Sequence, residues 1–346
     1  MKAFVIHDHG DVDVLRLEDR PRPEPGPGEV RLRVHAAALN HLDLWVRKGV
    51  PGHRFPLPLI PGADACGIVE AVGPGVTGIE PDRFQVLCPG YGCGRCDACL
   101  RGEESLCRDF GILGESRDGV CAECVVVPER TLIPLPEGLA PEEAVALPLV
   151  LLTTWRMLIK RARLAPGETV LVQAGGSGIG STAIQIAAFL GCRVIATVGT
   201  PEKAARAREL GANEVIVHTQ MDVAQAVRRL TGKRGVDVVV EHTGEATWAT
   251  SVRCLAKGGR LVTCGATTGA AAAIDLRVLF FKQLSLLGST MGSPIDLREA
   301  FRLVERGFIR PVVDRCFAME ELPEAQRYLE TRAAFGKVTL RGFGVA

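Results

Sequence analysis

The pattern of hydrophobic and polar positions changes near residue 150. Before it, short alternating runs such as 30–34 and 67–72 are separated by frequent Pro and Gly, which is typical of a β-rich domain. After it, short apolar runs alternate with amphipathic stretches, as in βαβ units that build a parallel sheet. The pattern predicts an α/β protein with a β-rich domain and a doubly wound, Rossmann-type domain.

In the second region, the apolar runs predict strands at 169–174, 193–198, 214–217, 236–241, 260–264 and 284–288. Amphipathic helices are predicted at 296–306 and 320–332, and a last strand at 337–341. The alanine run at 270–273 is interpreted as a loop.

Charge and hydropathy then narrow the classes of partner and location that fit the sequence. The 346 residues include 41 Lys and Arg and 40 Asp and Glu, a net charge of +1, which argues against nucleic acid or a membrane surface and favours a small-molecule substrate. No apolar run reaches the ~18 residues of a membrane span, and the start MKAFVIHDHGDVDVL lacks the pattern of a signal peptide. We expect a cytoplasmic protein whose twelve cysteines are reduced.

Four cysteines are clustered in the stretch CGRCDACLRGEESLC. Their C-x2-C-x2-C-x7-C spacing predicts a metal site formed by Cys93, Cys96, Cys99 and Cys107. Four thiolates with no open position are typical of structural zinc. An iron–sulfur cluster has similar needs and is the alternative, but the short spacing beside a Rossmann-type domain favours one structural zinc per chain.

The segment TVLVQAGGSGIGSTAIQIAAFLG places a strand, a glycine-rich turn and a helix in succession. Such a turn lets the backbone and the helix N-terminus bind a dinucleotide pyrophosphate. The residues predicted to contact the phosphates are Gly175, Gly178, Ile179 and Gly180. Ser177 stands where G-x-G-x-x-G has its middle glycine, which we interpret as a variant of the motif.

Other strand ends should border the same crevice, because ligands bind at the carboxyl ends of parallel strands. Thr243 and Gly265 are therefore candidate cofactor contacts, and plain loop positions are the alternative. At the end of the second strand, Val198 replaces the acid that would bind a ribose hydroxyl, and Thr200 and Lys203 follow. This favours NADP(H), with NAD(H) possible; the alternative is that Lys203 and the nearby Arg206 are solvated helix charges.

PGYGCGRCDACLRG followed by QAGGSGIG resembles the medium-chain dehydrogenase/reductase superfamily, which includes zinc alcohol dehydrogenases and quinone oxidoreductases, over essentially the whole chain. The resemblance implies a GroES-like catalytic domain at 1–150 and 291–346, with a zinc lobe at about 88–110. It also implies a Rossmann cofactor domain at 151–290 and a homodimer or homotetramer.

Zinc alcohol dehydrogenases of this superfamily hold a catalytic zinc that this sequence is not suited to bind. Asn40 stands at the first cysteine ligand, Ala63 and Asp64 replace a histidine and a glutamate, and Leu149 replaces the last ligand. Leu42 and Trp45 stand at the proton relay of that family. An Asn and an Asp do not make a catalytic zinc set.

The remaining features resemble the zinc-free quinone oxidoreductases. By that resemblance Asn40 shapes the nicotinamide and substrate pocket, and Asp64 is a second candidate catalytic residue. His41, Thr154 and Lys337 match positions that contact the cofactor. Each of these residues could instead be structural.

The leading hypothesis is therefore an NAD(P)H-dependent oxidoreductase that reduces a quinone or an α,β-unsaturated carbonyl without catalytic zinc, since charge on the substrate oxygen can be stabilised by hydrogen bonds. One alternative is an alcohol dehydrogenase with rearranged ligands, drawn from Asp64, Cys66 or His53. Another is a nicotinamide-binding protein with little catalysis.

Overall fold

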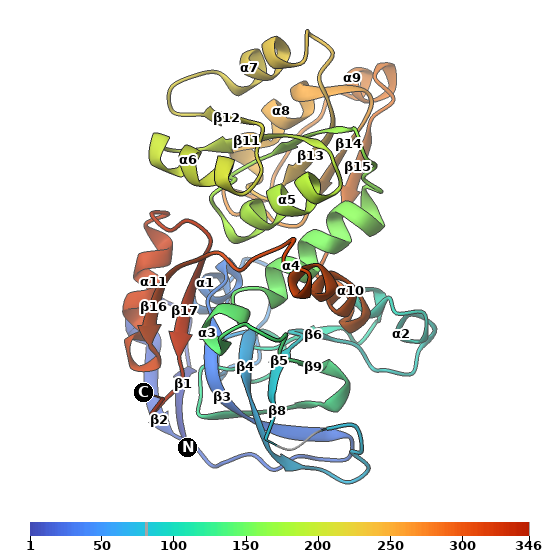
Figure 1. Cartoon of the computed structure of the whole chain (residues 1–346). Coiled ribbons are helices and arrows are strands. Elements are labelled where there is room, and N and C mark those ends of the chain that lie inside the picture. The colour runs from blue at the N-terminus through green and yellow to red at the C-terminus, as the bar shows by residue number, and fades with distance from the viewer. Residues whose placement is uncertain (80–81, 346) are drawn as a thin grey trace. The chain divides into compact units, whose positions relative to one another are not determined.

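The computed structural model describes residues 1–79 and 82–345; Ala346, the last position of the predicted first domain, lies outside them. The chain forms two compact units. Unit 1 comprises Met1–Leu149, Gly292–Glu305 and Arg310–Ala346, and unit 2 comprises Val150–Met291 and Arg306–Ile309. Unit 1 is rich in β-strands, and unit 2 is built on a six-stranded sheet with helices (Figure 1).

Unit 1 is built on a mixed sheet with the strand order β16-β17-β3-β4-β5-β9. Its strands are β3 (Glu29–Ala38), β4 (Asp64–Val72), β5 (Phe84–Leu87), β8 (Cys124–Pro128), β9 (Leu132–Pro134), β16 (Val313–Ala318) and β17 (Lys337–Arg341). The long strand β3 is shared: its first half pairs with β8 and its second half with β17. Two small hairpins add β1 (Lys2–Ile6) with β2 (Leu15–Asp19), and β6 (Gly90–Tyr91) with β7 (Gly111–Ile112).

The helices of unit 1 are α1 (His41–Lys48), α2 (Asp97–Leu100), α3 (Pro141–Ala144), α10 (Pro294–Glu305) and α11 (Leu322–Glu330). The sheet and α11 enclose an aliphatic core that includes Leu32, Val34, Leu329 and Leu340. Alternation along β3 buries Val30, Leu32 and Val34, as expected when one face of a strand meets a core. The first division between the units in the sequence falls within helix α4 (Pro148–Trp155).

Unit 2 contains, within the described residues, a six-stranded sheet in which every neighbouring pair is parallel. The order β12-β11-β10-β13-β14-β15 is that of a dinucleotide-binding fold. Successive strands are added toward one edge of the sheet up to β12 and toward the other edge from β13 onward, so the strand order reverses between β10 and β13. The strands are β10 (Thr169–Val172), β11 (Arg193–Val198), β12 (Glu214–Val217), β13 (Val236–Glu241), β14 (Leu255–Thr263) and β15 (Ser285–Gly288).

Helices cover the sheet of unit 2 because its strands are apolar on both faces. They are α5 (Gly178–Phe189), α6 (Pro201–Glu209), α7 (Val223–Leu230), α8 (Glu245–Cys254) and α9 (Leu276–Phe281). Leu171, Ile195 and Val239 pack with the apolar sides of α7 and α8. No helix among the described residues combines the length and apolar character that a membrane crossing needs.

Strands of both units differ from the sequence prediction, and in unit 1 β3 and β4 extend beyond the predicted runs 30–34 and 67–72. Strand β14 begins at Leu255 rather than at 260. Its register against β13 shifts between Leu255 and Arg260, where Gly258 takes a positive φ of 73°. The sequence also gave no indication of β16, whose residues are mostly exposed or half-buried at the edge of the sheet. The other predicted strands of unit 2 match within two residues at each end.

Candidate functional site

The glycine-rich turn follows β10, where the backbone folds tightly before α5 begins at Gly178. A side chain at Gly180 would place its Cβ 2.2 Å from the carbonyl oxygen of Ala174, and one at Gly175 would place it 3.1 Å from Cβ of Ala196. Only glycine fits at Gly180. The turn keeps the backbone open to a ligand at the start of a helix, where N–H groups and the helix dipole favour an anion.

Ser177 explains the variant in the glycine motif. It is the N-cap of α5, and its Oγ accepts a hydrogen bond from the Gly180 backbone N–H at 2.9 Å. Serine is a preferred N-cap for this reason. The residue that departs from G-x-G-x-x-G thus stabilises the same helix N-terminus, and Gly178, Ile179 and Gly180 form the first turn of that helix.

The end of β13 holds a buried carboxylate that the sequence analysis missed. Glu241 is fully buried and accepts hydrogen bonds from the Thr243 backbone N–H at 2.8 Å, the Gly244 N–H at 3.1 Å and the Ser251 hydroxyl at 2.6 Å. Burial alone would raise the pKa of Glu241, but the hydrogen bonds from Ser251 and Thr243 hold it below its usual value. The carboxylate fixes the loop that carries Thr243.

This carboxylate is linked to the glycine-rich turn by a buried polar chain. Ser251 accepts from Gln173 Nε2 at 3.0 Å, and Gln173 Oε1 accepts from the Thr197 hydroxyl at 2.8 Å. Beside it, His242 donates from Nε2 to the Gln173 carbonyl at 3.0 Å, and burial keeps the pKa of this imidazole below its usual value. The sequence feature that could have indicated these two residues is the polar pair Glu241 and His242 at the end of the apolar run VDVVVEH.

The remaining predicted cofactor residues of unit 2 lie at helix or strand ends. Thr200 is the N-cap of α6 and accepts from the Lys203 backbone N–H at 3.3 Å. Gly265 follows β14, and a Cβ there would lie 3.0 Å from the His242 carbonyl oxygen. Thr154 lies in α4, and its hydroxyl is buried with no hydrogen-bond partner among the described residues. A buried hydroxyl without a partner is unfavourable, so a ligand atom there would satisfy it.

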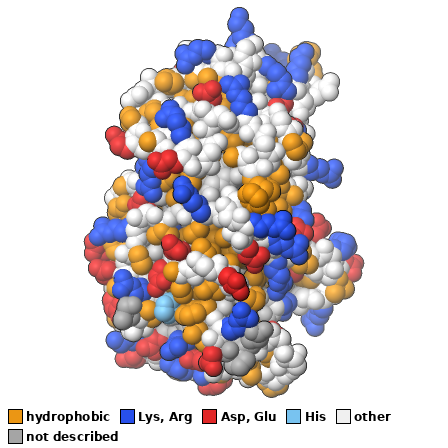
Figure 2. Space-filling view, viewed as in Figure 1, with side chains coloured by type: hydrophobic (Ala, Val, Ile, Leu, Met, Phe, Trp, Pro, Cys, Tyr) orange, Lys and Arg blue, Asp and Glu red, His pale blue; other side chains and the backbone are white. Residues whose placement is uncertain are grey.

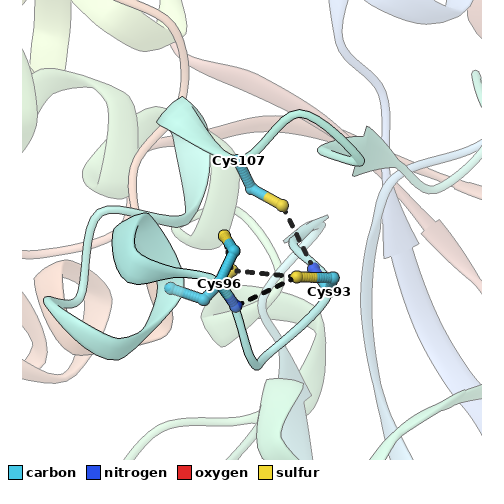
Figure 3. A group of neighbouring side chains, drawn as sticks. Cys93, Cys96 and Cys107 are labelled. Carbon is cyan, nitrogen blue, oxygen red and sulfur yellow. Dashed lines mark hydrogen bonds between the residues drawn. The ribbon is translucent and has the colours of Figure 1, made fainter.

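The four predicted cysteines of unit 1 converge on one point. Their sulfur atoms all lie within 4.8 Å of one another, and Figure 3 shows Cys93, Cys96 and Cys107 on one compact loop. The Sγ atoms of Cys96 and Cys99 are 3.6 Å apart, close to the roughly 3.8 Å that a tetrahedron with Zn–S bonds of about 2.3 Å requires. The donor set therefore fits a structural zinc.

The backbone around this loop also favours metal binding. The N–H groups of Arg95 and Cys96 lower the pKa of the Cys93 thiol to about 6, which favours a thiolate ligand. A side chain at Gly92 would place its Cβ 2.6 Å from Sγ of Cys99. Glycine is needed there because the loop passes so close to the ligands.

A second polar cluster in unit 1 brings together Asn40, Asp64 and Lys337. Lys337 Nζ donates to Asn40 Oδ1 at 2.5 Å and to Asp64 Oδ2 at 3.1 Å, and Asn40 Nδ2 donates to Asp64 Oδ2 at 2.9 Å. The three side chains are 7%, 0% and 4% exposed as residues. A buried ion pair of this kind requires further hydrogen bonds to offset desolvation, and the amide supplies them.

Strand register explains why three distant residues meet. Strands β17, β3 and β4 are neighbours, with Ala38 opposite both Thr339 and Asp64. The antiparallel register of β17 and β3 then places Lys337 at the level of Asn40, which lies two residues beyond the end of β3 and is the N-cap of helix α1. His41 is the first residue of that helix.

Asp43 is a fourth member of this cluster and was also missed from the sequence. It is 1% exposed, and its Oδ2 accepts from the Asn40 backbone N–H at 2.7 Å. Burial raises the pKa of Asp43 to about 7, although the Asn40 N–H and the charge of Lys337 act to lower it. A carboxyl in the first turn of a helix usually indicates an exposed capping residue, so its burial could not be predicted from the sequence.

The residues at the family's catalytic zinc position do not fit a metal. Ala63 and Leu149 offer no side-chain donor, and the Leu149 backbone N–H donates to Asp64 Oδ1 at 2.9 Å. The oxygens of Asn40 and Asp64 already accept from the cationic Lys337. Within residues 1–79 and 82–345, the four-cysteine cluster is the group of three or more His, Cys, Asp or Glu side chains that could hold a metal, and Cys66 and His53 do not join one with Asp64.

Figure 2 shows basic and acidic side chains interspersed over the visible face. This distribution agrees with the near-zero net charge. No strong field of one sign marks that face for a highly charged partner.

Comparison with known proteins gives consistent results for both units. Residues 26–137 match the family described as alcohol dehydrogenase GroES-like domain, and residues 178–306 match the family described as zinc-binding dehydrogenase. A quinone oxidoreductase of Pseudomonas aeruginosa is 35% identical over 344 residues, which cover 96% of this chain and 97% of that protein. An NAD-dependent alcohol dehydrogenase of Saccharolobus solfataricus is 32% identical, covering 90% and 92%.

A crystal structure described as an NAD-dependent alcohol dehydrogenase superimposes with a TM-score of 0.95 at 48% identity, covering 99% of both chains. The relatives are therefore named both as quinone oxidoreductases and as alcohol dehydrogenases. These matches, together with the glycine-rich turn and the four-cysteine cluster, agree over nearly the whole chain. The chain belongs to the medium-chain dehydrogenase/reductase superfamily and is an NAD(P)-dependent oxidoreductase.

Proposed function

We propose that this protein uses NADPH to reduce a quinone or an α,β-unsaturated carbonyl compound without a catalytic zinc. The observation that carries the proposal is the Lys337 ammonium bound between Asn40 and Asp64, where a zinc alcohol dehydrogenase would need metal ligands. Zinc alcohol dehydrogenases of the superfamily use such a metal and a proton relay to oxidise an unactivated alcohol. A conjugated carbonyl needs only a hydride and hydrogen bonds to its oxygen.

The residues of unit 2 would hold the cofactor by its phosphates. Gly175, Gly178, Ile179 and Gly180 would contact the pyrophosphate, with Thr243 and Gly265 along the neighbouring strand ends. The unpartnered Thr154 hydroxyl supports a contact at the nicotinamide end. His41 in unit 1 is a further proposed contact. The bound nicotinamide would supply hydride, and Asn40 would shape the substrate pocket by holding the Lys337 ammonium.

Residues at the end of β11 and the start of α6 bear on the choice between NADP(H) and NAD(H). Val198 is buried where an acid would bind the ribose hydroxyl, and Thr200 with Lys203 offers a hydroxyl, a helix N-terminus and a cation for a 2′-phosphate. Glu202 acts in the opposite direction, because hydrogen bonds from its own N–H and from Thr200 lower its pKa and keep it ionised. We propose that NADP(H) is preferred and that Glu202 limits the preference.

A homo-oligomer is also proposed, on the basis of the exposed edge of unit 2. Strand β15 is the last strand of its sheet, and the adjacent α9 exposes Leu276, Phe280 and Phe281 at 67%, 60% and 70%. An exposed apolar patch beside an unpaired strand edge is typical of an interface. A second copy of the chain would cover both.

Steady-state assays of purified protein test the proposed activity. NADPH oxidation should be rapid with 1,4-naphthoquinone or 2-cyclohexenone and should persist after mild chelation. Oxidation of primary alcohols with NAD+ or NADP+ should be slow. The 48% identical structure described as an alcohol dehydrogenase favours the opposite result, and fast, chelator-sensitive alcohol oxidation would establish it.

A further inference from the structure

The Lys337 ammonium has one donor more than the protein uses. A lysine ammonium carries three N–H donors and no acceptor. Two of them go to Asn40 Oδ1 and Asp64 Oδ2, and the described residues offer no third acceptor. Because the residue is 4% exposed, the third N–H is largely withdrawn from water, and a buried donor of this kind favours a partner.

The acceptors that hold the ammonium are themselves fixed. Asp64 Oδ1 accepts from the Leu149 backbone N–H at 2.9 Å, and Asp64 Oδ2 also accepts from Asn40 Nδ2. The Asn40 backbone is tied to Asp43. The Nζ atom is therefore held in one position by two anchored oxygens, and an electrophile that is already positioned needs little reorganisation during a reaction.

We propose that Lys337 is a catalytic residue whose third N–H donates to the substrate carbonyl oxygen, in the role that a metal plays elsewhere in the superfamily. The proposal rests on the proposed function and extends it, since it names the group that accepts the developing negative charge. Asn40 and Asp64 are then positioning residues for the ammonium. The substrate class it fits is a conjugated enone or a quinone.

In the reduction of an enone, the bound NADPH would supply the hydride and become NADP+, and its nicotinamide C4–H bond would break. The β-carbon receives hydride and forms a C–H bond, the C=C pair moves to the adjacent bond, and the C=O pair moves to oxygen. The N–H bond of Lys337 breaks as its proton forms an O–H bond, which gives an enol and a neutral amine. Water reprotonates the amine, and the enol converts to the saturated ketone.

This role differs measurably from the cofactor contact that the family resemblance implies for Lys337. A lysine that binds a cofactor phosphate contributes mainly to NADPH affinity. A lysine that donates to the substrate oxygen contributes to turnover and leaves NADPH affinity unchanged. The two readouts can be separated, because NADPH binding is followed by its fluorescence without any substrate.

The test compares wild type, K337M, K337R and the control K48M, which removes an exposed lysine that pairs with Glu330 in the same unit. K337M leaves the Asp64 carboxylate buried without its cation, so the charge-balanced D64N/K337M is measured as well. The readouts are the melting temperature, the Kd for NADPH, and kcat and KM with 2-cyclohexenone and 1,4-naphthoquinone.

We expect kcat to fall about 100- to 1000-fold in K337M and in D64N/K337M, the usual loss for one donor to a developing oxyanion. The NADPH Kd should stay within about twofold, the K48M variant should match wild type, and K337R should retain part of the activity as a cation. A tenfold or larger rise in NADPH Kd with a smaller fall in kcat would overturn the proposal and return Lys337 to the cofactor. Absence of wild-type turnover with both substrates would instead refute the proposed function, and this inference with it.

Discussion

Replacing Glu241 by alanine is expected to destabilise unit 2 strongly. The buried carboxylate accepts from two backbone N–H groups, those of Thr243 and Gly244, and from the hydroxyls of Thr243, Thr247 and Ser251. The hydroxyls can rotate toward other acceptors, but the two N–H groups cannot. Each buried donor left unpaired costs about 1–3 kcal/mol, so the free energy of unfolding should fall by about 2–6 kcal/mol.

The variant E241Q isolates the contribution of charge. Glutamine keeps one acceptor oxygen for the N–H groups but loses the charge that strengthens the bonds, so we expect a smaller loss of about 1–2 kcal/mol. Because the pKa of Glu241 is lowered in the folded protein, its stabilisation is present above its usual pKa and is lost as pH falls through the folded value. Wild type should therefore lose stability toward acid more steeply than E241Q.

Calorimetry measures the loss of stability in E241A, and NADPH titration measures the loss of cofactor affinity. A loss of 2–6 kcal/mol corresponds to a fall of roughly 5–20 °C in melting temperature, and NADPH affinity should weaken because the Thr243 loop is no longer fixed. E209Q is the matched control, since Glu209 is exposed at the end of α6. If E241A melts within about 2 °C of wild type and binds NADPH equally well, the carboxylate does not hold this loop.

Four other substitutions probe the remaining features. K203E should weaken NADPH by about 1–3 kcal/mol, the range of a charge-assisted contact, while E202Q should strengthen it relative to NADH; equal NADPH and NADH affinities in wild type would contradict the preference. C96S should lower the melting temperature by roughly 5 °C or more with little loss of kcat per folded molecule, and selective loss of kcat with unchanged melting would show that the zinc is catalytic. Because burial raises the pKa of Asp43 to about 7, wild type should lose stability as pH rises from about 4 to 7 relative to D43N, by up to roughly 4 kcal/mol; parallel pH profiles in denaturant titrations would refute this.

Local patterns in the sequence predicted much of the fold. The strand, glycine turn and helix from Thr169 to Phe189 follow one another within a short segment, so their geometry depends on neighbouring residues. The four cysteines likewise lie on one loop, and spacing alone indicated that their sulfurs converge. In contrast, β16 is a half-exposed edge strand whose position depends on pairing with β17, which follows it across an intervening helix.

The polar clusters could not be predicted because their contacts are distant in sequence. Lys337 is 297 positions from Asn40 and 273 from Asp64, and only the register of three strands brings them together. The burial of Asp43 and Glu241 depends on packing that hydrophobic patterns do not report. The family resemblance implies a cofactor contact for Lys337, and it gave no indication that the Lys337 ammonium also bonds Asn40 and Asp64.

Zinc content measured together with turnover tests the central claim most directly. Purified protein should contain one zinc per chain by elemental analysis, bound by Cys93, Cys96, Cys99 and Cys107. Reduction of 1,4-naphthoquinone or 2-cyclohexenone by NADPH should continue after mild chelation, and primary alcohols should be oxidised slowly. Two zincs per chain, with rapid alcohol oxidation that chelators abolish, would contradict the account, because a catalytic metal would then be bound by ligands other than those described for unit 1.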